Sequence, residues 1–141
     1  MGNKIERPTT TQSVTCEVET ACNKLHVILG SVEGEPIEVF IISGKGGECQ
    51  KAFCEALGRM ISLAMQHGAP LSEVIKQLKA IQCPKPITFP KVKRVLSCPD
   101  ATAKALTDLV AVERGRKDVG VKECLPEEPD RDGQRCNAPD E

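Results

Sequence analysis

The fold is decided by two apolar runs, Leu25-His26-Val27-Ile28-Leu29 and Ile37-Glu38-Val39-Phe40-Ile41-Ile42. Both runs are short and rich in β-branched residues, which favours strands over helices. Residues 30–35 lie between them and contain two glycines, and Pro36 follows directly. A segment of this kind reverses the chain, so we expect a loop of several residues here. The sequence therefore predicts an antiparallel hairpin.

A further strand is indicated on the N-terminal side of this hairpin. From Ser13 onward the sequence alternates, so that Val14, Cys16 and Val18 would share one face of an extended chain. This period of two is typical of a half-buried strand. Residues 1–11 are polar and rich in threonine, which predicts a flexible N-terminal arm.

Three helices are predicted on the C-terminal side of the hairpin. Apolar residues recur every three or four positions over residues 48–67 and again over 71–81, which is the period of a helix with one apolar face. The third helix is expected to run from Ser97 to about Glu113, with Ser97 as the N-cap and Asp100 as the reciprocal capping carboxylate. The apolar face of the first helix is expected to consist of Phe53, Ala56, Leu57, Met60, Ile61 and Ala64.

The composition changes after the third helix. Residues 113–141 contain nine acidic and six basic side chains among 29 residues, and apolar groups are sparse. Such a segment cannot bury enough apolar surface to fold, so we expect a disordered, charged tail. The predicted organisation is an arm over residues 1–11, one domain over 12–112 and the tail over 113–141. The predicted fold class is α+β, with a small antiparallel sheet, a hairpin or three strands, packed against about three helices.

Length and composition exclude several classes of protein. A chain of 141 residues is too short for a large α/β barrel, and no apolar run approaches the roughly 20 residues that span a bilayer. With three Phe, no Trp and no Tyr, a base-stacking platform for single-stranded nucleic acid is disfavoured. The first residues lack the apolar core of a secretory signal, so we expect a cytoplasmic protein whose thiols are reduced.

Eight cysteines are the strongest chemical signal in the sequence, although no two of them form a Cys-x-x-Cys pair. Four of them stand at the boundaries of predicted elements, where side chains from distant segments can meet. Such a set can bind a metal ion, but four small thiols in turns and core positions are an equally good explanation. The predicted metal ligands are Cys22, Cys49, Cys83 and Cys98.

Two weaker candidate binding sites are a glycine-rich loop with backbone amides and a stretch of basic residues. The loop Gly44-Lys45-Gly46-Gly47 between a strand and a helix could bind phosphate, but a tight strand-to-helix turn explains its glycines equally well. No acidic residue occurs between Glu73 and Asp100, and the basic surface expected there suits a nucleotide, a nucleic acid or an acidic protein. An ordinary solvated surface is the alternative. The residues of this basic surface are Lys85, Lys91, Lys93 and Arg94.

Several segments together resemble the TSCPD domain family over about residues 12–112. They are Thr20-Ala21-Cys22-Asn23-Lys24-Leu25, Pro36 to Ile42 with Gly44-Lys45-Gly46-Gly47-Glu48-Cys49, Glu55 to Ala64, Ile75 to Pro84, and Ser97-Cys98-Pro99-Asp100-Ala101. The resemblance implies a domain found at the C-terminal end, or as the small partner, of adenosylcobalamin-dependent (class II) ribonucleotide reductases. It also implies that the four boundary cysteines are structural zinc ligands.

The expected function follows from this resemblance. The chain would be a non-catalytic accessory domain that acts with the large subunit of a vitamin B12-dependent ribonucleoside-diphosphate reductase in deoxyribonucleotide synthesis. The chain has no counterpart of the reductase's catalytic barrel or cobalamin site, so it is not expected to bind cobalamin or to be catalytic alone. Two alternatives stay open: a thiol redox partner that uses Cys124 and Cys136 of the tail, and a nucleotide- or nucleic-acid-binding module. An apolar sheet face covered by few helices is also compatible with a homodimer.

Overall fold

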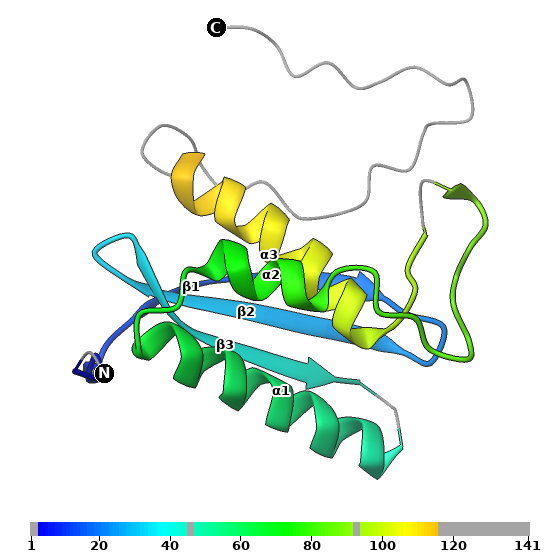
Figure 1. Cartoon of the computed structure of the whole chain (residues 1–141), viewed down its shortest axis with the longest axis horizontal. Helices are drawn as coiled ribbons and strands as arrows, with labels where there is room; N and C mark the ends of the chain where they lie inside the picture. The colour runs from blue at the N-terminus through cyan, green and yellow to red at the C-terminus, as the bar shows by residue number, and fades with distance from the viewer. Residues whose placement is uncertain (1–2, 45–46, 92–93, 116–141) are drawn as a thin grey trace, which may run out of the picture.

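The computed structural model confirms the predicted α+β fold. Three antiparallel strands form one sheet in the order β1-β2-β3, and three helices follow them in the chain (Figure 1). The strands are β1 (Gln12–Glu19), β2 (Lys24–Val32) and β3 (Glu35–Ser43). The helices are α1 (Glu48–Gln66), α2 (Leu71–Leu78) and α3 (Cys98–Gly115). The structure describes residues 3–44, 47–91 and 94–115.

The hairpin connection is shorter than the sequence indicated. Instead of a loop over residues 30–35, the two strands continue to Val32 and resume at Glu35. The turn residues Glu33 and Gly34 both have positive φ, at 51° and 80°. Two successive residues of this kind are typical of a type I′ turn, whose twist matches that of the paired strands. The tight turn was hidden in the sequence because glutamate, unlike asparagine, is not a usual residue for its first position.

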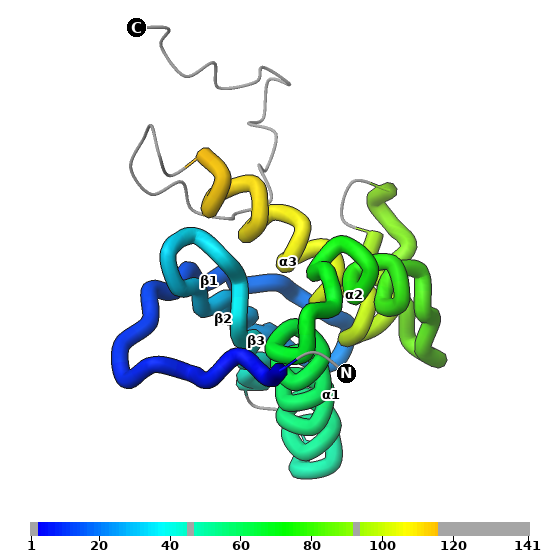
Figure 2. Tube along the Cα trace, turned by 60° about the vertical axis from the view of Figure 1, so that its left-hand side comes forward, coloured from blue at the N-terminus to red at the C-terminus, as the bar shows by residue number. Residues whose placement is uncertain are grey.

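The core lies between the sheet and the helices. Figure 2 shows how the three helices lie along the sheet. Helix α3 packs against β1 and β2, α2 packs against α3, and α1 packs along β3. The fully buried side chains that fill this space are Leu25, Val27 and Leu29 of β2, Val39 of β3, and Leu106 and Leu109 of α3.

The predicted apolar face of α1 is wrong at three positions, Phe53, Ala56 and Met60, which are all exposed. Phe53 and Met60 are 77% and 62% exposed, whereas Cys54 and Met65 are buried. The helix makes its closest approach to the sheet at Gly58, where an added Cβ would lie 3.1 Å from the carbonyl oxygen of Val39. Counting apolar side chains cannot detect a contact made by a glycine, so the predicted face was rotated only partly away from the true one, which still includes Leu57 and Ile61.

Helix α1 also closes the outer edge of the sheet. The Val39 N–H donates to Oγ of Ser62 at 2.9 Å, and the same hydroxyl lies 3.1 Å from the Val39 carbonyl oxygen. Near the other end of the helix, Nε2 of Gln66 donates to the carbonyl oxygen of Ile37 at 3.4 Å. Backbone groups that β3 would otherwise present to another strand are thus satisfied by side chains of α1.

Helix α2 ends earlier than predicted, and α3 ends later. The apolar pattern placed the end of α2 near Ile81, but the helix stops at Leu78 and Ile81 is 44% exposed. Ala80 has a φ of 67°, a left-handed conformation that does not continue a helix. Helix α3 continues through Gly115. Residues 116–141, which include most of the predicted tail with Cys124 and Cys136, lie outside the described residues.

The N-terminal residues make contacts that the sequence did not indicate. The Arg7 guanidinium forms an ion pair with the carboxylate of Glu38, which is buried in β3. Thr11 Oγ1 also donates to this carboxylate, and the Ile5 N–H donates to the carbonyl oxygen of Gln66 at 2.9 Å. The pair with Glu38 raises the pKa of Arg7 above its ordinary value. Flexibility of this arm stays a prediction, and its described part touches both β3 and α1.

Over the described residues, no helix combines the length and the apolar character needed to cross a membrane.

Candidate functional site

Three of the four predicted metal ligands line one small cavity. Cys22 comes from the β1–β2 connection, Cys83 from the segment after α2, and Cys98 is the first residue of α3. The cavity is also lined by Thr20, Ala21, Lys85, Val95 and Ser97. Residues more than 70 positions apart in the chain therefore line the same cavity.

A tight turn carries Cys22. The Thr20 N–H donates to the carbonyl oxygen of Asn23 at 2.9 Å, and the Thr20 hydroxyl donates to the same oxygen at 2.8 Å. The Asn23 N–H in turn lies 3.2 Å from the Thr20 hydroxyl oxygen. Thr20 is buried, so these bonds are shielded from water, and Cys22 is exposed within the turn. The threonine thus fixes the backbone on both sides of the cysteine.

A buried carboxylate holds the other two cysteine segments together. Oδ1 of Asp100 accepts the Ala80 N–H at 2.9 Å, and Oδ2 accepts the Leu96 N–H at 3.0 Å. The Cys83 N–H donates to the Leu96 carbonyl oxygen at 2.9 Å, which brings the segment after α2 beside the start of α3. Asp100 was predicted to cap its own helix, and this is wrong. Its carboxylate faces the neighbouring segment because α2 ends at Leu78 and leaves the Ala80 N–H free to donate.

Ser97 has the predicted capping role and a second one. The Asp100 N–H donates to Oγ of Ser97 at 3.2 Å, which confirms Ser97 as the N-cap of α3. The Ser97 hydroxyl itself donates to the carbonyl oxygen of Ile81 at 2.5 Å. Ser97 directly precedes Cys98 and Asp100 lies two residues after it, so hydrogen bonds on both sides of Cys98 fix its position.

The charge on Asp100 is stabilised by these partners. Burial alone would raise the pKa of Asp100, but the hydrogen bonds from the backbone amides of Leu96 and Ala80, together with the Lys104 ammonium, bring it below the ordinary value of 3.8. The Lys104 Nζ lies 3.2 Å from Oδ2. Asp100 is therefore ionised at neutral pH although its side chain is 3% exposed.

Cys49 does not line the cavity. It lies in the first turn of α1 and is exposed. The next residue, Gln50, connects this helix to both sides of the cavity. Its Nε2 donates to Sγ of Cys98 at 3.2 Å, and its Oε1 accepts from Nδ2 of Asn23 at 3.3 Å. Sequence reasoning missed Gln50 and Asn23, since neither residue type carries a spacing signal.

A fifth described cysteine, Cys54, lies close to this site without facing it. It is buried in α1, and burial raises the pKa of its thiol, with a further contribution from the charge of Cys98. Cys54 therefore stays protonated and acts as a core residue. Cys16 is likewise buried, within β1.

The donor set fits a zinc ion, although the thiols are not gathered around one point. Among the residues that the structure describes, no group of three or more Cys, His, Asp and Glu side chains is close enough to hold a metal ion. Four thiolates are nevertheless a usual structural zinc set. Three of these thiols line one cavity, and the fourth neighbours a residue that is hydrogen-bonded to Cys98. Cys22, Cys49, Cys83 and Cys98 are thus the residues that could hold zinc.

The glycine loop is only partly described. Gly44 donates its N–H to the carbonyl oxygen of Lys24 at 3.0 Å, and Gly47 is the N-cap of α1 without a side-chain capping bond. Lys45 and Gly46 lie outside the described residues. The Gly44 amide is therefore already used to close the strand-to-helix turn, and phosphate binding by this loop stays a prediction.

The basic residues lie on the segment between α2 and α3. Ile87 and Val95 form a short antiparallel bridge, which draws this segment into a small hairpin. Lys85 lines the cysteine cavity, Lys91 and Arg94 follow on the hairpin, and Lys93 lies outside the described residues. Phe89 on the same hairpin is 86% exposed. The sequence did not single out this aromatic ring.

Comparison with known proteins gives one result. No curated protein and no solved structure matches the chain. The family model described as the TSCPD domain matches residues 2–110, which include all six strands and helices except the last residues of α3. Because this match covers well over half of the 141 residues, the chain belongs to the TSCPD domain family, a family associated with ribonucleotide reductases.

Proposed function

We propose that this protein is a non-catalytic accessory domain of a vitamin B12-dependent ribonucleoside-diphosphate reductase, and that it acts in deoxyribonucleotide synthesis in the cytoplasm. Membership of the TSCPD domain family supports the link to a reductase. The proposal assigns catalysis to the large subunit, because an α/β barrel needs about 200 residues or more and the matched domain spans residues 2–110. The large reductase subunit is the proposed partner.

We also propose that Cys22, Cys49, Cys83 and Cys98 hold a structural zinc ion. The observation that carries this proposal is the convergence of Cys22, Cys83 and Cys98 on one cavity from three separate segments. Zinc would cross-link these segments to each other and to α1, and such a bond contributes to folding free energy. The protein's own residues prepare the site, since Thr20, Gln50 and Asp100 fix the backbone or side chains beside the cysteines.

Association with the reductase can be measured with purified proteins. The zinc-loaded chain is mixed with the catalytic subunit of a class II reductase that lacks a TSCPD domain, and the mixture is analysed by size-exclusion chromatography and by ribonucleoside-diphosphate reduction. We expect co-elution and a higher turnover than with the catalytic subunit alone. No association at tens of micromolar, with turnover unchanged, would contradict the proposed partnership.

The same assay separates the accessory role from the redox alternative. A double variant with Cys124→Ser and Cys136→Ser removes the thiols that a redox partner would use. An accessory domain predicts full stimulation by this variant with thioredoxin as the reductant. Loss of stimulation, with co-elution retained, would instead favour the redox role.

A further inference from the structure

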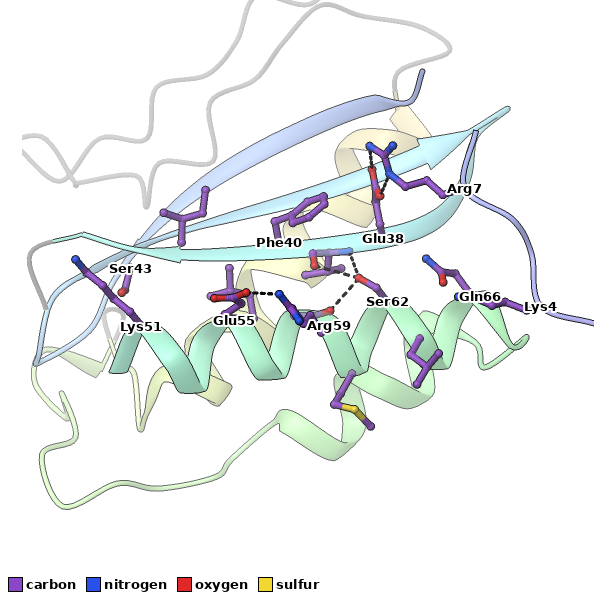
Figure 3. Close-up of a pocket in the computed structure, with 16 residues that line it drawn as sticks. Lys4, Arg7, Glu38, Phe40, Ser43, Lys51, Glu55, Arg59, Ser62 and Gln66 are labelled. Carbon is purple, nitrogen blue, oxygen red and sulfur yellow. Dashed lines mark hydrogen bonds and ion pairs between the residues drawn. The ribbon is translucent and has the colours of Figure 1, made fainter. Parts of the chain in front are cut away.

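A groove runs between β3 and α1, on the face of the sheet opposite to the core (Figure 3). Its volume is about 850 Å³. Alternate residues of β3 point to opposite faces of the sheet, so the core takes Val39 and Ile41 while Phe40 and Ile42 face the groove. The exposed apolar side chains in the groove are Phe40, Ile42, Met60 and Leu63, which are between 41% and 62% exposed. This apolar surface has no partner among the described residues.

The charges in the groove are mostly balanced, but two are not. Arg7 pairs with Glu38, and Arg59 pairs with Glu55 at 2.6 Å. The remaining cations are Lys4 and Lys51, and neither has an ion-pair partner within the described ranges. In Figure 3 these two lysines lie at opposite ends of the groove. The groove therefore combines exposed apolar side chains with two ion pairs and carries one free positive charge at each end.

The length of the groove can be obtained from helix geometry. Lys51 is in the first turn of α1, and the arm that carries Lys4 is fixed at the far end by the hydrogen bond from Ile5 to Gln66. The 15 residue steps from Lys51 to Gln66 correspond to about 22 Å along the helix axis. A helix of roughly 15 residues has the same length.

The structure also limits how a partner can be recognised. A peptide cannot add to the sheet as a further strand at β3, because α1 covers that edge and Ser62 already bonds Val39. Recognition must therefore use side chains, as when an amphipathic helix lies in an apolar groove. A small ligand is disfavoured because small-molecule sites bury most of the ligand, whereas the apolar side chains here are about half exposed.

We infer that this groove binds an amphipathic helix of another protein, about four turns long, with apolar side chains along one face and acidic residues at both ends. The apolar face would cover Phe40, Ile42, Met60 and Leu63. The acidic ends would pair with Lys4 and Lys51. This site is separate from the cysteine cavity and does not depend on the proposed zinc ion or reductase.

The test uses the full-length chain and a displayed library of 15-residue helical peptides with randomised surface positions. Enriched peptides are synthesised, and their dissociation constants are measured by fluorescence anisotropy. We expect enrichment of amphipathic sequences with Asp or Glu at both ends. Exchange of those acids for lysine should weaken binding at least tenfold, and a rise in salt should weaken it as well.

Matched variants locate the binding site. Phe40→Asp and Lys51→Glu should each weaken binding at least tenfold. Phe53→Asp and Lys91→Glu change an exposed phenylalanine and an exposed lysine that do not line the groove, and each should change the dissociation constant less than twofold. Circular dichroism of every variant confirms that it is folded.

Four results would overturn the inference. The first is the absence of enriched peptides, and the second is enrichment of peptides that lack the acidic ends. The third is equal weakening by the groove variants and their controls. A dimer in sedimentation analysis that Phe40→Asp dissociates, without peptide binding, would also overturn it, because the occupant would then be a second copy of the chain.

Discussion

At the scale of single residues, Asp100 decides how the cysteine segments are arranged. Its two carboxylate oxygens accept backbone amides from Ala80 and Leu96, and Cys83 is bonded to the carbonyl group of Leu96. Neither accepted amide belongs to the first turn of α3, so the role of Asp100 is to join two segments rather than to cap a helix.

Replacement of this carboxylate by an amide should therefore destabilise the whole domain. In Asp100→Asn, one of the two oxygens becomes an N–H donor that faces a backbone N–H. We expect a loss of about 2–3 kcal/mol in the free energy of unfolding, as for the loss of buried hydrogen bonds to a charged group. Urea denaturation near pH 7 measures this difference.

The pH dependence of this stability difference tests whether it comes from the ionised carboxylate of Asp100. The pKa of Asp100 is lower in the folded chain than its ordinary value of 3.8, so the unfolded chain binds the proton more readily. The stabilisation is complete above about pH 5 and is lost as the pH falls through the lowered folded pKa. The difference in the free energy of unfolding between wild type and Asp100→Asn should therefore become smaller below about pH 4. If the difference in unfolding free energy stayed the same down to pH 2, the ionised carboxylate would not be its cause.

At the scale of elements, the sequence predicted that α1 exists, but it did not predict how α1 packs against β3. The existence of α1 and nearly its exact ends followed from apolar spacing and from the glycines on either side. The orientation of α1 could not be predicted from apolar spacing. It depends on the contact of the Gly58 backbone with Val39 and on the hydrogen bond of Ser62, and neither residue is part of an apolar pattern. The exposure of Met60 in the groove is a consequence of that orientation.

The bond between these elements gives a direct prediction. Ser62→Ala leaves the Val39 N–H and carbonyl group at the sheet edge without a side-chain partner, which should cost about 1–2 kcal/mol of unfolding free energy. Hydrogen exchange of the Val39 amide should become faster. The exposed Ser72 of α2 offers the control, since Ser72→Ala should change stability by less than about 0.5 kcal/mol. Unchanged exchange at Val39 would contradict the closure of the edge by Ser62.

At the scale of the whole molecule, the cysteine cavity was the part of the site most open to prediction. Cys22, Cys83 and Cys98 stand where predicted elements begin or end, and the fold brings those positions together. The residues that fix them could not be foreseen, because Gln50 and Asn23 act through long-range bonds that leave no local pattern. The groove was invisible for the same reason, since it depends on how α1 meets β3.

The central claim is that four cysteines hold a structural zinc ion, and metal analysis of the purified full-length chain tests it most directly. We predict about one equivalent of zinc per chain, a lower melting temperature in chelator, and zinc content below half an equivalent in Cys22→Ser and Cys98→Ser. Cys54→Ala removes a buried thiol outside the set and should keep its zinc. Less than half an equivalent in the wild type, with a melting temperature that chelator leaves unchanged, would contradict the account.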